Sequence, residues 1–215
     1  GGGGGGERGE GRGGWAGEGV VGGARRGERR QGYHGEDADR RRVQPARHDR
    51  LPGGYAFGSI QVSRGCPRKC SFCSVSAFNG NRYRQRPIEK VVEEFRTIQE
   101  KLVLIVDDNL IGTSAKHIAR AKDLFRAMIR AKLRKKGICQ VTINLADDEE
   151  LLMLAAKAGC KGVFIGFESP RKEGLLEVGK KFNILKGRDF KASVRRIQQH
   201  NILVVGSFII GLDTD

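Results

Sequence analysis

The chain has 215 residues, a formal net charge of +15 at pH 7 and five cysteines. The odd number of cysteines and the lack of a secretory apolar segment disfavour a disulfide-stabilised secreted protein. The longest apolar run, 202–212, is interrupted by Gly206 and Ser207 and is too short to span a membrane. We therefore expect a soluble, cytoplasmic protein with no membrane span.

The amino-terminal segment differs in composition from the rest of the chain. The first fifty residues hold seventeen of the thirty-two glycines and almost no apolar periodicity. Such a segment buries too little surface to offset its ordering entropy, so we predict that residues 1–44 are a disordered, Gly- and Arg-rich segment. The remaining residues, 45–215, are long enough for one domain with a sizeable core.

From about residue 57 the chain alternates apolar runs with helical patterns. Nearly continuous apolar runs indicate strands covered on both faces in a parallel sheet. Right-handed crossovers between such strands give an α/β sheet or a partial barrel. The five expected strands are 58–63, 102–107, 138–144, 162–167 and 202–210.

The four expected helices have recognisable start and stop signals. Pro87 suits the N1 position of the first, Ser114 can cap the second, and Asp147 or Asp148 can cap the third. Gly159 would end the third helix, and a fourth covers 190–200. The cations of 126–136 end the second helix. We expect them to complement its dipole and face solvent, because no aromatic residues are interleaved with them for nucleic-acid stacking.

Three cysteines, Cys66, Cys70 and Cys73, stand in a C-x3-C-x2-C pattern directly after the first strand. This spacing lets one loop place three thiolates on three irons of a cubane and leaves the fourth iron open. A structural zinc site needs four ligands, and the four histidines show no matching pairs. Cys139 and Cys160 lie in apolar runs, where buried, unreactive thiols are expected.

Polar residues follow each expected strand. Ligands collect at the carboxyl ends of parallel strands, so these residues are candidates for the site. Two acids that end an apolar strand are costly without a nearby cation, which favours a functional role for Asp107 and Asp108. The segments that follow the strands are the cysteine loop, 107–109, Asn144, 168–169 and 211–213.

Phe72, the aromatic residue before the third cysteine, completes the pattern C-x3-C-x-aromatic-C. This segment resembles the radical S-adenosylmethionine (SAM) superfamily. The stretch 45–215 is similar to radical SAM proteins of the type associated with a cobalamin (B12)-binding domain, which includes hopanoid-modifying enzymes. The resemblance implies a partial (β/α)6 radical SAM barrel, here truncated after the fifth strand. Besides the cysteine loop, the matching segments are 55–61, 74–80, 106–109, 164–169 and 206–213.

The resemblance also implies a mechanism. The cysteines would hold a 4Fe–4S cluster whose open iron binds the amino and carboxylate groups of SAM, and reductive cleavage would give a 5′-deoxyadenosyl radical that abstracts hydrogen from an unreactive carbon. By position, Asp107, Asp108 and Asn109 would contact the methionine ammonium, and Glu168 the ribose or the ammonium. Phe72 would contact the adenine through its backbone, and the strand from Gly206 to Gly211 would let the adenine approach closely. The adenine motif is matched loosely, because these glycines are five residues apart.

For the whole protein, the resemblance implies a cobalamin-assisted methyl transfer to a small-molecule or lipid substrate. The reductant would be a flavodoxin or ferredoxin, and no specific nucleic acid is expected. Residues 1–44 are too short and polar for a cobalamin domain, so cobalamin would bind only in a longer native protein. An RNA-modifying methylthiotransferase is an alternative, but its second cluster needs three more cysteines, and 1–65 contain none. A non-catalytic iron–sulfur or basic binding protein is the third reading; an electron carrier would normally close its cluster with four cysteines.

Overall fold

The computed structural model describes residue 1, residues 45–184 and residues 187–214. The predicted disorder of 1–44 therefore concerns a segment that, apart from residue 1, lies outside the described residues. All helices and strands of the described residues belong to the unit Gly32–Asp215. None of these helices has the length and apolar character needed to cross a membrane.

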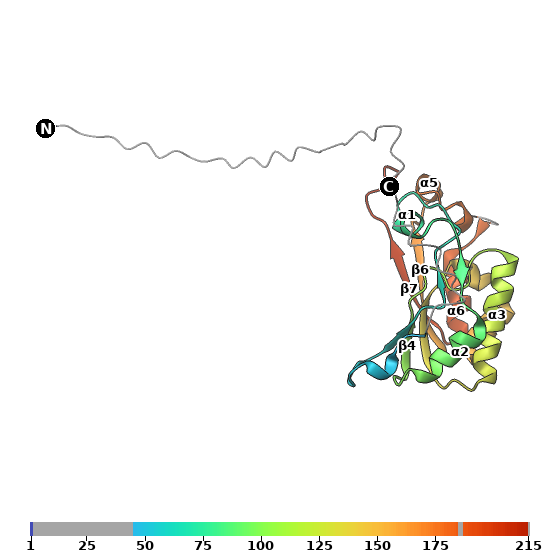
Figure 1. Ribbon diagram of the computed structural model, residues 1–215. Coiled ribbons are helices and arrows are strands. Elements are labelled where there is room, and N and C mark those ends of the chain that lie inside the picture. Colours follow the sequence, from blue (N-terminus) through green and yellow to red (C-terminus); the bar gives the residue numbers. More distant parts are fainter. Residues whose placement is uncertain (2–44, 185–186, 215) are drawn as a thin grey trace. The chain divides into compact units, whose positions relative to one another are not determined.

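The main sheet has five strands that follow one another in chain order and pair in parallel, β1-β4-β5-β6-β7. This confirms the predicted α/β class and the number of strands. Across the described residues the sheet stays open and does not close into a barrel (Figure 1). The bounds of its strands are β1 Gly58–Ile60, β4 Leu102–Ile105, β5 Lys136–Gln140, β6 Cys160–Glu168 and β7 Leu203–Phe208.

Four longer helices form the crossovers between these strands. Ser114 caps α3 by accepting a hydrogen bond from the backbone N–H of His117, and Asp148 caps α4 in the same way through Leu151. Pro87 occupies the N-cap of α2 rather than the predicted N1 position. Gly159 follows α4 with a φ of +98°, a left-handed conformation that glycine adopts without strain. The helices are α2 Ile88–Thr97, α3 Ala115–Arg130, α4 Glu149–Lys157 and α6 Phe190–Gln199.

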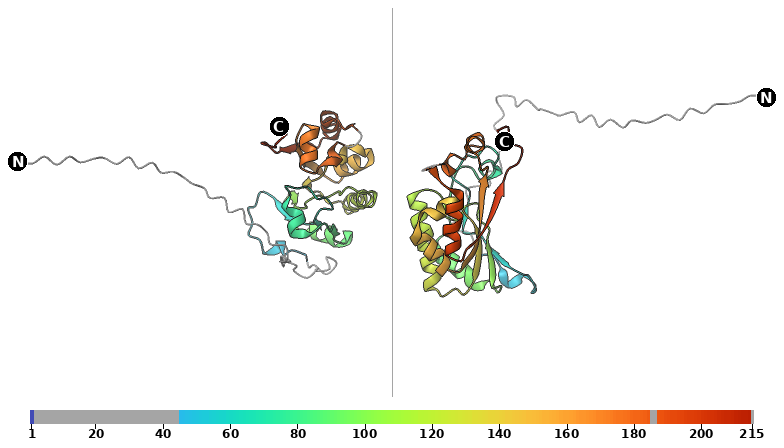
Figure 2. Two further views of the ribbon diagram at one scale, coloured as in Figure 1. Left: turned by 90° about the horizontal axis from the view of Figure 1, so that it is seen from above. Right: turned by 180° about the vertical axis from the view of Figure 1, so that it is seen from behind.

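The hydrophobic core lies between the sheet and these helices, which cover one face of it (Figures 1 and 2). Val103, Ile105 and Ile165 point into this core, while the alternate residues Val106 and Phe164 are about half exposed on the opposite face. The expectation that both faces are covered is therefore wrong for the described residues. An open sheet leaves the face that a closed barrel would enclose accessible to solvent.

Short elements depart from the predicted pattern. The third strand begins at Lys136 and ends at Gln140, and the last two residues of the predicted strand, 143 and 144, belong instead to a 3-10 helix, Ile143–Asp147. A two-stranded antiparallel ribbon, β2 (Ser63–Arg64) with β3 (Arg84–Gln85), flanks the cysteine loop. Two six-residue helices, α1 (Ser74–Asn79) and α5 (Lys172–Glu177), follow the cysteine loop and β6. They are too short to show an apolar period in the sequence.

Candidate active site at the carboxyl ends of the strands

The cysteine loop lies at the carboxyl end of the sheet, between β2 and α1. Cys66, Cys70 and Cys73 are free thiols and are half-buried. The backbone N–H of Cys73 donates to the carbonyl of Cys70 at 3.2 Å, and Cys73 is itself the N-cap residue of α1. The loop thus presents three thiols from one short turn, as the C-x3-C-x2-C spacing predicts.

The three thiols of the loop lie close enough to one another to interact electrostatically. Burial raises the pKa of both the Cys66 and the Cys70 thiol, and the neighbouring thiols of the loop add to each rise. Within the part of the chain that the structure describes, no three His, Cys, Asp or Glu side chains are grouped closely enough to hold one metal ion. A cubane binds each thiolate on a separate iron, so its ligands are more widely spaced.

Asp107 holds the chain that leads into the loop. Its Oδ1 accepts the backbone N–H of Val62 at 2.7 Å, and its Oδ2 accepts the hydroxyl of Ser63 at 2.5 Å. The carboxyl group is almost fully buried, and burial raises its pKa to about 6. Asp108 adds a third anchor, because its Oδ2 accepts the backbone N–H of Gly65 at 2.9 Å. The two acids therefore order the loop from the adjacent strand end.

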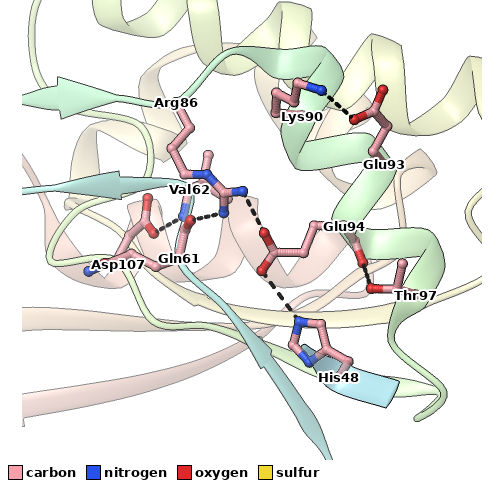
Figure 3. Close-up of polar contacts among 9 residues, drawn as sticks. All are labelled: His48, Gln61, Val62, Arg86, Lys90, Glu93, Glu94, Thr97 and Asp107. Carbon is pink, nitrogen blue, oxygen red and sulfur yellow. Dashed lines mark hydrogen bonds and ion pairs between the residues drawn. The ribbon is translucent and has the colours of Figure 1, made fainter. Parts of the chain in front are cut away.

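A buried ion-pair network supports the same segment from the other side (Figure 3). Arg86 donates to the carbonyl of Gln61 at 2.8 Å and also pairs with Glu94 of α2. The other carboxylate oxygen of Glu94 lies 3.3 Å from Nε2 of His48. In Figure 3, Arg86 and Asp107 meet Gln61 and Val62 from opposite sides. The entry to the cysteine loop is thus fixed by two separate buried groups.

Asn109 is also part of the scaffold. Its Oδ1 accepts the backbone N–H of Gly112 at 3.2 Å, and its Nδ2 donates to Thr142 at 3.3 Å. The hydroxyl of Tyr83 lies 2.7 Å from the Asn109 carbonyl, and burial raises the pKa of Tyr83 to about 12. The side chains of Asp107 and Asn109 form hydrogen bonds within the protein, and their predicted contact with the methionine ammonium stays a prediction.

Glu168 ends β6 with an unusual backbone and a buried ion pair. Its φ is +67°, in the left-handed region that non-glycine residues seldom adopt. Its carboxylate pairs with Lys180, which also donates to the carbonyl of Gly166 at 2.7 Å. A Cβ at Gly166 would lie 2.3 Å from Oε1 of Glu168, so this glycine leaves room for the pair. Strain of this kind clusters at functional sites.

Lys180 is a further candidate for the site that the sequence analysis did not include. The positive charge of Lys180 opposes the rise in the pKa of Cys70, which places its ammonium within electrostatic reach of that thiol. The segment before Lys180 packs on the cysteine loop: the backbone N–H of Ser71 donates to the carbonyl of Val178 at 3.2 Å. Lys180 stands in a short polar turn with no periodicity, so nothing in the sequence marks it.

The remaining predicted site residues are Phe72, Gly206 and Gly211. Phe72 is 46% exposed beside the third cysteine. A Cβ at Gly206 would come within 2.7 Å of the Phe167 ring, so its lack of a side chain serves packing against that ring. Gly211 adopts a φ of +86°, and nothing lies within 4 Å of its added Cβ. The predicted approach of adenine to this strand stays a prediction.

The two other cysteines lie in the hydrophobic core, as predicted. Cys139 on β5 and Cys160 on β6 are both buried. The Cys160 thiol donates to the carbonyl of Gly162 at 3.6 Å, and a hydrogen bond to Cys160 helps raise the pKa of the Cys139 thiol. Neither thiol is available to the loop at the strand ends.

Comparison with known proteins agrees with this geometry. The Hopanoid C-2 methylase of Rhodopseudomonas palustris is 32% identical over 165 residues, which are 75% of this chain and 31% of that protein. The Bacteriochlorophyllide d C-12(1)-methyltransferase of Chlorobaculum tepidum is 33% identical over 162 residues, 73% of this chain and 34% of that protein. The chain thus spans about a third of the length of these curated relatives.

The fold has a solved counterpart. The structure of the radical SAM methyltransferase TsrM from Kitasatospora setae, with cobalamin and a [4Fe–4S] cluster bound, superposes with a TM-score of 0.62 at 27% identity, covering 73% of this chain and 31% of that one. The profile of the Radical SAM superfamily matches residues 60–215. The chain therefore belongs to the radical SAM superfamily, and its relatives include cobalamin-dependent radical SAM methyltransferases.

Proposed function

We propose that this chain is the catalytic core of a radical SAM enzyme in which Cys66, Cys70 and Cys73 hold a 4Fe–4S cluster and SAM binds the fourth iron. The observation that carries this proposal is the presence of three half-buried thiols in one loop, with the other two cysteines of the chain buried in the core. Three ligands from one loop leave one iron open to a small chelating molecule. When bound, the cluster and SAM supply reductive cleavage and hydrogen abstraction from an unreactive carbon.

The protein contributes orientation and charge to this chemistry. Asp107 and Asp108 hold the loop through backbone hydrogen bonds, so the three thiols are ordered before the cluster binds. Glu168 and Lys180 place a carboxylate and an ammonium side by side near Cys70. The methionine part of SAM carries both an ammonium and a carboxylate, and charge-assisted hydrogen bonds to such a pair are the strong ones. We assign Asp108 and Glu168 to the ammonium or ribose, and Lys180 to the carboxylate.

For the longer protein, we propose methyl transfer to an unreactive carbon of a small-molecule or lipid substrate in the cytoplasm. The names of the relatives support this reaction class, since they include methylases and methyltransferases of hopanoid and bacteriochlorophyllide substrates. The electron would come from a flavodoxin or ferredoxin. Cobalamin would be held by a further part of the longer protein.

The binding of SAM is the direct test of this proposal. Adding SAM to the reconstituted, reduced chain should change the electron paramagnetic resonance spectrum of the cluster. Asp108→Asn and Glu168→Gln should each weaken SAM binding by about 1–3 kcal/mol, because each removes a charge-assisted hydrogen bond. Glu173→Gln, which changes an exposed carboxylate on α5, serves as the matched control. A spectrum that does not change at saturating SAM, in a folded sample with intact cluster, would contradict the proposal.

A further inference from the structure

Seven exposed cations gather at the amino ends of the strands, the end of the sheet opposite the cysteine loop. They come from the end of α3, the end of α4 and the starts of three neighbouring strands. We call this group the basal surface. Its members are Lys101, Arg130, Lys132, Arg134, Lys136, Lys157 and Lys161.

The chain segments that contain these cations are hydrogen-bonded to one another and form one continuous patch. The backbone N–H of Lys136 donates to the carbonyl of Lys101 at 2.7 Å, which joins the start of β5 to the start of β4. The backbone N–H of Gly137 donates to the carbonyl of Gly159 at 2.9 Å, which joins β5 to the turn before β6. Because the three strand starts are hydrogen-bonded in a row, the cations lie on one fixed surface rather than on separate mobile loops.

The cations of the basal surface outnumber the nearby acids: in the segments 100–101, 130–136 and 157–161, which carry them, Glu100 is the one acid. None of the seven cations forms an ion pair with a carboxylate of the described residues. The flank of α3 differs, because Lys122 and Arg126 there pair with Asp148, Asp123 and Glu150. The dipole of α3 accounts for a cation at Arg130 but not for those at the strand starts. Like charges held together without partners cost free energy and favour an anionic ligand.

The chemistry around the cations favours a lipid surface over RNA. Single-strand recognition uses aromatic rings interleaved with cations, and neither 130–136 nor 157–161 contains an aromatic residue. Two exposed apolar side chains lie beside the surface instead, at the basal end of the uncovered face of the sheet. Leu203, 63% exposed, starts β7 and pairs in register with Gly162, next to Lys161. Phe57, 48% exposed, precedes β1. Lys and Arg beside Leu and Phe side chains is the combination by which amphipathic helices bind a membrane interface.

We propose that the basal surface binds the phosphate headgroups of an anionic lipid bilayer, with the cysteine loop directed away from the membrane. Lys and Arg contribute the attraction to the negative headgroups, and Leu203 and Phe57 enter the boundary between headgroups and acyl chains. This inference is independent of the cluster chemistry, since it uses none of the residues of the cysteine loop, β6 end or Lys180.

The test is vesicle flotation with the 215-residue chain, which separates bound protein from any aggregate. Vesicles of phosphatidylcholine alone are compared with vesicles that also contain phosphatidylglycerol, at low and at physiological salt. The test variant carries Arg130→Gln, Arg134→Gln and Lys136→Gln. The matched control also removes three positive charges, but from the opposite end of the sheet. In it the exposed residues Lys116, Lys172 and Lys191 are changed to Gln. Thermal melting is used to check that both variants are folded.

We expect the chain to float only with the vesicles that contain phosphatidylglycerol, and salt should weaken this binding. Each cation near an anionic surface contributes about fivefold, so the basal variant should bind about 100-fold more weakly, while the control keeps the wild-type affinity. Equal flotation with both kinds of vesicle would overturn the proposal, as would equal losses for the two variants. Displacement of the chain from the vesicles by sub-micromolar structured RNA would also overturn it and assign the surface to nucleic acid.

Discussion

Replacing Asp107 with Asn should remove a specific part of the pH dependence of folding. Asp107 is the buried acid that accepts hydrogen bonds from Val62 and Ser63. In the variant, the amide oxygen can still accept the Val62 N–H, and the amide nitrogen can donate to the Ser63 hydroxyl. The Asp107→Asn protein should therefore fold and keep the loop anchor while losing the titratable group.

The size and sign of the effect follow from the pKa of Asp107. Burial raises this pKa from 3.8 in the unfolded chain to about 6 in the folded one. Between these values the folded state keeps a proton that the unfolded state has released, so stability falls as the pH rises. The shift of about 2 units corresponds to about 3 kcal/mol at 1.36 kcal/mol per unit. This stability is fully present below about pH 4 and is lost as the pH rises through about 6.

The assay is urea unfolding of both proteins, kept reduced and free of iron, at a series of pH values from 4 to 7. The difference in the free energy of unfolding should move in favour of Asp107→Asn by about 3 kcal/mol over this range. Ser63→Ala provides a second check. It removes a hydroxyl that favours the ionised carboxylate, so the pH range of the loss should extend upward. A difference between wild type and Asp107→Asn that stays constant with pH would refute the reasoning.

Two further changes test other parts of the structure. Lys180→Met leaves the buried carboxylate of Glu168 without its cation and should lower the free energy of unfolding by about 3–5 kcal/mol in urea unfolding. Adding Glu168→Gln to this variant should restore part of the loss. Strictly additive losses would contradict an interaction between Glu168 and Lys180. Gly206→Ala places a methyl 2.7 Å from the Phe167 ring and should cost about 1–3 kcal/mol, whereas Gly137→Ala, with nothing within 4 Å, should be close to neutral. Equal melting temperatures for these two glycine variants would contradict the packing role of Gly206.

The features that the sequence predicted well are those with a local cause. The five parallel strands follow from apolar runs, and the caps at Ser114 and Asp148 follow from side chains that bond a backbone N–H three residues away. The cysteine loop is local in the same sense. The predicted third strand was too long because Val141 and Ile143 are apolar. They are buried, but Ile143 lies in the 3-10 helix that crosses the end of the sheet.

The features that the sequence missed depend on residues far apart in the chain. The hydrogen bonds of Asp107 were not predicted, because its partners Val62 and Ser63 lie more than forty residues earlier and only the pairing of β1 with β4 brings them together. Lys180 was missed for the same reason, since its pairing with Glu168 depends on how the turn after α5 packs on β6. Such contacts are set by tertiary structure and leave no period or motif in the sequence.

The most direct test of the proposed function is the number of iron and sulfide ions bound after anaerobic reconstitution. We predict four of each per chain for the wild type, as in any 4Fe–4S cluster. Serine at Cys66, Cys70 or Cys73 should abolish this binding, whereas serine at the buried Cys139 or Cys160 should leave it in folded protein. Stoichiometric zinc without iron in the anaerobically purified chain, or a full cluster in the three loop variants, would contradict the assignment.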